Sequence, residues 1–429
     1  MGSVNKALVG MFLTVMLTHS LYSVIAPFFP QIAAERGIGG SFVGWVFSCY
    51  PIAAALLSPV LGLVVSKLGR KRVFLGGAVV VILSGFSFAL LPLMSDFWFK
   101  VSALSLRLIQ GAGGSALGTA CFAIIASNYP DQMEALMGMQ QTMTAAGMMI
   151  GPILGAALYS YGGFTFLFIS FSCVFSLFIP YACYYIPKDK PYVKPLLEVQ
   201  LKHLIDPGLF TVGGVVVLAM ITMTFTEPVL SEHLLSFSVP SALIGLFFTI
   251  PTVPYVGVAL FFSKIPESVP RKYLMVLGMV ISFIAMLLLG PWKGLYLPHN
   301  LVVVSLGLVV MGVGLAFSIL PCLPELVKIG QAKLPEHNPE HVSDAVSGFL
   351  TFCFFVGEIV GPPLAGFLRD LSGFENAAAY TGGLDLVYGF IFMGVTKFFI
   401  DKKYKKPEPI QQELVSTKET YYEMNEEEV

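Results

Sequence analysis

Arg107, Glu227 and Glu358 are charged side chains inside long apolar stretches of the sequence, and Glu325 lies at the end of another. An ionisable group in an apolar, membrane-like environment is costly, and it usually faces a cavity or a partner. Burial favours the neutral form of a carboxyl group, so such an acid can take up a proton on one side of a membrane and release it on the other. When ionised, the same carboxylate can bind a cation. These residue types predict exchange of protons against a cationic solute.

Each of the three acids also has a structural alternative. Glu227 precedes a proline that breaks the helix where a solute can meet freed backbone groups, or it is a carboxylate at a helix end. Glu325 binds substrate or forms a salt bridge with Lys328. Glu358, beside a glycine, carries protons or makes a structural hydrogen bond to a neighbouring helix.

Arg107 is the only basic residue well inside an apolar stretch, so it must be paired or hydrated. Gln110 follows it on the same helix face and can extend a hydrogen-bond network. An unperturbed histidine titrates near neutral pH, which would suit a role of His19 in proton coupling, although a lone histidine among apolar residues more often only packs. We therefore group Arg107, Gln110 and His19 with Glu358 as proton-coupling candidates. A purely structural pair is the alternative for Arg107.

Three tyrosines complete the candidate site. Tyr255 follows a proline in an apolar stretch and can place its ring over an ammonium group, and Tyr22 and Tyr50 are further candidates for such a cage. Aromatic residues make up 13% of the chain, so most of them must pack in the core or face lipid. With Glu227 and Glu325, these tyrosines are the predicted substrate-binding residues.

The composition places these residues in a membrane. The chain has 429 residues, of which 56% are hydrophobic and 12% charged, against about 25% charged residues in soluble domains. This excludes a water-soluble enzyme. The net charge of −1 gives no attraction to nucleic acid. No phosphate-binding loop, metal-ligand cluster or activated nucleophile is present in the sequence, so we expect no enzyme activity, no cofactor and no metal.

A helix needs about 20 apolar residues to cross a bilayer, and the sequence predicts twelve such spans in an all-α membrane protein. They lie near 6–30, 41–66, 73–95, 101–127, 137–160, 163–186, 208–231, 241–263, 272–291, 300–324, 345–368 and 376–400. Most lysines and arginines fall in loops on one side, which predicts that both termini are cytoplasmic.

The longest charged interruption divides the spans six and six. We expect an N-terminal half at 1–186, a cytoplasmic linker at 187–207, a C-terminal half at 208–400 and a disordered cytoplasmic tail at 401–429. We expect a monomer.

The two halves share an internal repeat. Gly138, Gly147, Gly151 and Pro152 in the fifth span recur 210 positions later as the corresponding residues of the eleventh span. These later residues are Gly348, Gly357, Gly361 and Pro362. Such tandem repeats are typical of transporters that bind their solute between two halves. The glycines also let helices pack closely.

The motif of the fifth span resembles the antiporter motif of the major facilitator superfamily. The run from Arg107 to Gly114 resembles the intramembrane arginine motif of that superfamily, and Gly62–Lys71 resembles its cytoplasmic loop motif. The loop-motif positions are Gly62, Ser66, Lys67, Gly69 and Arg70. Ser66 stands where the family has an acid, so the resemblance implies a weakened cytoplasmic latch.

Within the superfamily the chain resembles the vesicular amine transporters, and most of all their polyamine branch. The residues that carry this resemblance are Glu227-Pro228, Ser318–Pro321 with Pro324-Glu325, and Val346–Gly348. The monoamine branch has an acid, a lysine and an aspartate at three positions where this chain has Thr18, Tyr50 and Thr351. The resemblance therefore implies a different cation arrangement.

These observations predict a proton-coupled antiporter that moves a polyamine or related amine into an acidic vesicle. Two alternatives remain open: export of another solute, such as a drug-like compound or an organic anion, and a non-transporting structural or sensor subunit. The expected partners are an organic cation, protons and the lipid bilayer. The expected location is a vesicle or endolysosomal membrane, with the plasma membrane as the alternative.

Overall fold

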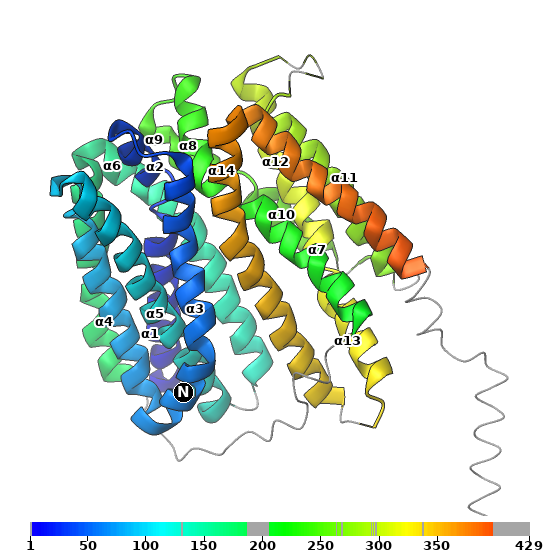
Figure 1. Ribbon diagram of the computed structural model, residues 1–429. Helices are drawn as coiled ribbons and strands as arrows, with labels where there is room; N and C mark the ends of the chain where they lie inside the picture. The colour runs from blue at the N-terminus through cyan, green and yellow to red at the C-terminus, as the bar shows by residue number, and fades with distance from the viewer. Residues whose placement is uncertain are drawn as a thin grey trace, which may run out of the picture.

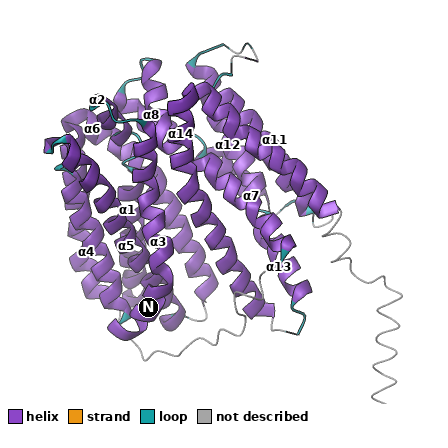
Figure 2. Ribbon diagram, in the orientation of Figure 1, coloured by secondary structure: helices purple, strands orange, loops and turns teal. Residues whose placement is uncertain are grey.

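The computed structural model describes residues 2–129, 132–186, 206–262, 264–266, 269–292, 294, 296, 298–336 and 339–397. Every regular element in these ranges is a helix (Figure 2). The predicted tail 401–429 and all but the last two residues of the predicted linker 187–207 lie outside the described residues.

Helices α1 to α6 form the first group. The first predicted span is split into α1 and α2, and Pro27 lies in the break. The bounds are α1 (Gly2–Ser23), α2 (Phe29–Glu35), α3 (Gly40–Leu68), α4 (Arg70–Phe88), α5 (Asp96–Asn128) and α6 (Met133–Tyr185), with a short 3-10 helix, η1, at Leu91–Leu93.

Helices α7 to α14 form the second group, and prolines break three of its spans. Pro228, Pro254 and Pro324 are each the third residue of the second helical piece of their span. A proline inside a helix removes a backbone hydrogen bond and displaces the preceding turn. The bounds are α7 (Pro207–Thr224), α8 (Thr226–Ser236), α9 (Ser241–Phe247), α10 (Thr252–Phe262), α11 (Arg271–Leu289), α12 (Leu301–Ile319), α13 (Cys322–Lys333) and α14 (Pro339–Val395).

Two of the helices each make two crossings. α6 turns at Gly163 (φ 71°) and α14 turns at Gly373 (φ 81°), and glycine tolerates this left-handed conformation. The two turns are again 210 positions apart. Nine helices of the described part are long and apolar enough to span a membrane. With α6 and α14 counted twice, and with α1 added, which is not among the nine, the twelve predicted crossings are found.

The two groups pack around separate cores (Figure 1). One buried apolar cluster takes its buried members from residues 11–186, and two others take theirs from 209–392. Large apolar side chains such as Leu56, Leu177 and Phe390 are more than 70% exposed, as a surface that faces lipid requires. These two groups are the two predicted six-span halves.

The glycines of the repeated motif hold equivalent helices together in each half. A Cβ atom on Gly151 would lie 3.1 Å from the Ser20 carbonyl carbon of α1, and one on Gly361 would lie 3.1 Å from Ile221 Cα of α7. Gly147 and Gly357 meet the same two helices one turn away. The repeat therefore fixes the fifth span against the first and the eleventh against the seventh.

The prolines of the same motif lie where the halves meet. A Cβ atom on Gly44 of α3 would lie 2.7 Å from Pro363 Cα, next to the Pro362 carbonyl, and one on Gly245 of α9 would lie 2.8 Å from the Pro152 carbonyl carbon. The halves touch near one face of the bundle and diverge toward the face where α1 begins (Figure 1). We call the latter the N-terminal face and the former the opposite face.

The loop motif lies at the N-terminal face. Gly69, with φ 93°, separates α3 from α4, Arg70 is buried and Lys67 is exposed. Gly62 and Ser66 belong to α3, but their surroundings are outside what the structure describes.

Candidate functional site

Arg107 is fully buried on α5, where it interacts electrostatically with Glu227 of the second half. Its Nη1 atom donates a hydrogen bond of 2.7 Å to Gln110 Oε1 and a weaker one of 3.4 Å to the Tyr22 carbonyl. Gln110 Nε2 lies 3.4 Å from the Leu21 carbonyl. The break after α1 frees these carbonyls, so the predicted Arg107–Gln110 pair anchors the end of α1 to α5.

Three aromatic rings surround the guanidinium group. Arg107 Cζ lies 4.8 Å from the ring centre of Tyr22, 5.3 Å from that of Tyr50 and 5.7 Å from that of Phe47. The Tyr22 and Tyr50 rings are 4.5 Å apart. Aromatic faces attract cations, so this cluster can accommodate a second positive group only if a counter-charge is near.

The second half supplies that counter-charge. Tyr22 donates a hydrogen bond of 3.5 Å to Glu227 Oε1. Glu227 lies in the first turn of α8, directly after the break from α7, and its Oε2 atom is buried without a hydrogen-bond partner among the described residues. The proline that follows creates the break that places this acid at the interface.

Glu358 on α14 belongs to the same cluster. Its carboxylate interacts electrostatically with Glu227, Tyr22 and Tyr50. On the facing helix, Ser48 donates a hydrogen bond of 2.7 Å to the carbonyl of Ile359, the next residue. Glu358 thus lies beside a direct contact between α3 and α14.

This arrangement can do acid–base and cation-binding chemistry. Glu227 of the second half interacts with Arg107 and Tyr22 of the first, and Glu358 of the second half interacts with Tyr22 and Tyr50. The Nε and Nη2 atoms of Arg107 are buried without hydrogen-bond partners in the described ranges. A buried polar group without a partner costs free energy, so these atoms are poised to bind water or a solute. Within the described ranges, no three His, Cys, Asp or Glu side chains are grouped as metal ligands would be.

Three predicted site residues lie outside the cluster. The Nδ1 atom of His19 lies 2.9 Å from the Val15 carbonyl oxygen, one turn earlier in the same helix. Tyr255 on α10 and Glu325 on α13 both interact with Cys322 instead. No salt bridge joins Glu325 to Lys328 in the described part of the chain. The structure therefore divides the predicted substrate-binding residues between two places.

Thr18, Tyr50 and Thr351 occupy the three positions where the monoamine branch has charged residues. Thr18 is buried and donates to the Thr14 carbonyl at 2.9 Å, and Thr351 is exposed and donates to the Ser347 carbonyl at 3.0 Å. Tyr50 is the one of the three positions that joins the cluster.

Sequence reasoning missed Phe47 and Asp385. Phe47 is one of many phenylalanines, so no signal distinguished it. Asp385 is a buried acid in the last span, and Thr222 donates a hydrogen bond of 2.7 Å to its Oδ2 atom. Because Asp385 lies inside the apolar span 376–400, the sequence could have identified it as a candidate residue.

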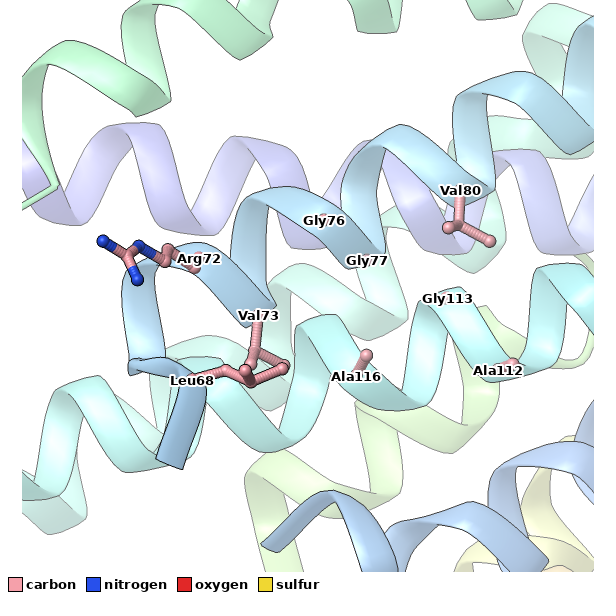
Figure 3. Close-up of a pocket in the computed structure, with 9 residues that line it drawn as sticks. All are labelled: Leu68, Arg72, Val73, Gly76, Gly77, Val80, Ala112, Gly113 and Ala116. Atoms are coloured by element: carbon pink, nitrogen blue, oxygen red, sulfur yellow. The ribbon is translucent and has the colours of Figure 1, made fainter. Parts of the chain in front are cut away.

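A separate cavity of about 370 Å³ lies between α4 and α5. It is apolar, lined by small residues such as Gly76, Gly113 and Ala116, and Arg72 lies at one end (Figure 3). It contains none of the predicted substrate or proton residues.

The chain is similar to known transporters over nearly its whole length. The family model described as Major Facilitator Superfamily matches residues 11–327 and 212–420. The human MFS-type transporter SLC18B1 is 29% identical over 402 residues, which cover 93% of this chain and 87% of that protein. The mouse protein of the same name is 30% identical and covers 86% and 81%. The mouse synaptic vesicular amine transporter is 23% identical and covers 81% and 64%.

Solved structures show the same fold. A bacterial homologue of the human lysosomal transporter Spinster, inward-facing and unoccupied, has a TM-score of 0.75 at 12% identity and covers 94% of this chain and 99% of its own. The nucleoside transporter NupG has a TM-score of 0.71 at 16% identity and covers 91% and 99%. The predicted fold and the resemblance to vesicular amine transporters are confirmed, and the chain is a transporter homologue, not an enzyme. It belongs to the major facilitator superfamily.

Proposed function

We propose that this protein is a proton-coupled antiporter that moves an organic cation, a polyamine or related amine, from the cytoplasm into an acidic compartment. The observation that carries the proposal is the meeting of Glu227 and Glu358 with Tyr22 and Tyr50 across the boundary between the halves. The similarity to vesicular amine transporters supports the amine class of substrate.

Coupling follows from competition for the carboxylates. An ionised Glu227 and an aromatic face bind an ammonium group, and two acids suit a solute with more than one amine. Protons that reach the pair from an acidic lumen neutralise the acids and release the amine. Deprotonation toward the cytoplasm then restores the binding form. Obligatory exchange requires only that the two cations exclude each other.

The orientation and location form part of the proposal. The excess of lysine and arginine in the loops that the sequence predicts on the side of the N-terminus supports cytoplasmic termini. The opposite face is then lumenal, in a vesicle or endolysosomal membrane, with the plasma membrane as the alternative. The halves are bounded by the linker 187–207, and the functional unit is a monomer.

Uptake into proteoliposomes tests the proposal. Purified protein is reconstituted with an acidic interior, and labelled spermidine, putrescine and a monoamine are supplied outside. Uptake that collapses when the pH gradient is dissipated is the expected result. No amine uptake with an intact gradient would contradict the proposal. Protein-free liposomes control for passive accumulation of weak bases.

One observation favours a second candidate, export of an organic anion. The two unpartnered nitrogen atoms of Arg107 could bind a carboxylate. Thermal-shift measurements with amines and with organic anions separate the two, because a ligand stabilises the protein that binds it. Stabilisation by anions alone would favour the second candidate.

A further inference from the structure

Arg369 and Asp370 are adjacent residues of opposite charge near the end of the first arm of α14, at the opposite face. The Asp370 carboxylate crosses to the other half and accepts three hydrogen bonds at the start of α3. The donors are the Gly40 backbone at 3.0 Å, the Ser41 backbone at 2.8 Å and the Ser41 hydroxyl at 2.8 Å. An acid at a helix N-terminus satisfies free N–H groups and the helix dipole.

Arg369 binds within its own half. Its Nη2 atom forms an ion pair with Glu232, and its Nη1 atom lies 3.3 Å from Asp370 Oδ1. Glu232 belongs to α8, the same eleven-residue helix that holds Glu227 in its first turn. One short rigid helix therefore links the carboxylate of the candidate site to the ion pair at the opposite face.

The backbone around these residues is shaped for a close approach. A Cβ atom on Gly39 or Gly40 would lie 3.0 Å from an Asp370 carboxylate oxygen, and Gly366 packs directly on the Gly40 carbonyl. A larger residue at these positions would push α14 from α3. The glycines let Asp370 reach the amide groups of α3 directly.

The internal repeat shows that this contact is present at only one of two equivalent places. The position 210 residues before Asp370 is Ser160, at the same point of α6. Ser160 is exposed and donates to the Ala157 carbonyl of its own helix. The contact between α6 and α9 thus has no charged equivalent of Asp370 at this position. The packing that the two halves share through the repeat therefore does not explain why Asp370 is present.

We propose that Arg369 and Asp370 form a latch that holds the halves together at the opposite face and couples this closure to α8. Asp370 holds the other half, Arg369 holds α8, and the link between them makes opening depend on the position of the helix that carries Glu227. The inference rests on the proposed transport cycle, in which this face must open to release the solute.

Spin-label distance measurements test the latch without requiring transport. Labels are placed at Glu35 of α2 and Ser236 of α8, which are exposed on opposite halves at the latch face, after the exposed Cys173 and Cys183 are replaced by serine. For Asp370→Asn, and more strongly for Asp370→Ser, we expect the ratio of long to short distances to rise about two- to fivefold, the size expected for a charge at a helix N-terminus.

Asp96→Asn is the matched control. It removes a carboxylate at the same face whose ion pair with Arg36, 3.0 Å, lies within one half. Its distance distribution should match that of the parent protein. An unchanged distribution in both Asp370 variants, or an equal shift in Asp96→Asn, would overturn the latch.

Arg369→Gln separates the two functions of the latch. Because Asp370 keeps its three bonds to α3, we expect a smaller shift in distance than with Asp370→Ser. We also expect a several-fold change in the apparent amine affinity measured by thermal shift, because α8 loses its anchor. No change in affinity would overturn the coupling to α8. If no amine binds even the parent protein, the proposed function fails, whereas the distance result still decides the latch.

Discussion

The phenolic oxygen of Tyr22 lies 3.5 Å from Oε1 of Glu227, across the boundary between the two halves. The donor belongs to α1, which is fixed to α5 through Arg107 and Gln110, and the acceptor belongs to α8. In the proposed transport cycle, rocking of the halves lengthens this bond. We therefore expect both amine binding and the change of conformation to alter this contact.

Two substitutions of Tyr22 distinguish the contribution of its hydroxyl group to amine binding from that of its ring. Tyr22→Phe keeps the ring against Arg107 and loses a long, weak hydrogen bond, so we expect the KM for amine uptake to rise about two- to fivefold. Tyr22→Ala also removes the aromatic face and should raise KM by about tenfold or more. Equal effects of the two variants in proteoliposome uptake would show that the ring contributes nothing to cation binding.

Glu227 and Glu325 should differ in their effect on amine uptake, although the sequence analysis predicts both as substrate-binding residues. Glu227→Gln removes the charge at the interface cluster, and we expect amine uptake to fall about tenfold or more. Glu325→Gln changes an acid outside the cluster and should alter uptake less than about twofold. Initial rates of labelled spermidine uptake, normalised to reconstituted protein, measure both. A larger loss with Glu325→Gln would move the site to α13.

Two glycines of one motif should respond differently to the same substitution. Gly151→Ala places a methyl group against α1, and we expect it to destabilise the protein by about 1–3 kcal/mol. Among the described residues, a Cβ atom on Gly138 meets no atom outside its own helix backbone and chain neighbours within 4 Å, so Gly138→Ala should be neutral or slightly stabilising, as alanine is in a helix. Thermal unfolding in detergent compares them. Equal melting temperatures would show that close packing of α6 on α1 is unimportant.

Asp385 is expected to stabilise the contact between α14 and α7. Asp385→Leu leaves the Thr222 hydroxyl without its partner, at a cost of about 1–3 kcal/mol in the free energy of unfolding. Asp385→Asn keeps an acceptor and should preserve both the melting temperature and the pH dependence of uptake. A shifted pH profile in Asp385→Asn with normal stability would instead make Asp385 a proton carrier.

The fold could be predicted from the sequence because lipid imposes simple rules on it. Apolar runs of sufficient length gave the spans, and the glycines at a constant offset of 210 gave the repeat. Gly163 and Gly373, which make the turns of α6 and α14, obey that offset as well. The break beside Pro228 was predicted, but the breaks beside Pro254 and Pro324 were not, because a proline can kink a helix without ending it.

The site could be predicted only in part, because residue type does not show which way a side chain faces. Arg107, Gln110, Tyr22, Tyr50, Glu227 and Glu358 come together as a cluster, and their functional assignment remains a proposal. Glu325, Tyr255 and His19 have the same chemistry but lie elsewhere. Asp370 lies between two predicted spans, and only the approach of α3 in the structure shows that it binds the start of that helix.

Glu358→Gln in two assays tests proton coupling most directly. The proteoliposomes measure amine accumulation driven by an imposed pH gradient, and exchange of labelled for unlabelled amine with no gradient. We predict that Glu358→Gln loses gradient-driven accumulation by about tenfold or more, because a glutamine side chain cannot take up and release the proton, while it keeps exchange. Accumulation by Glu358→Gln equal to that of the parent protein would contradict proton transport through this residue.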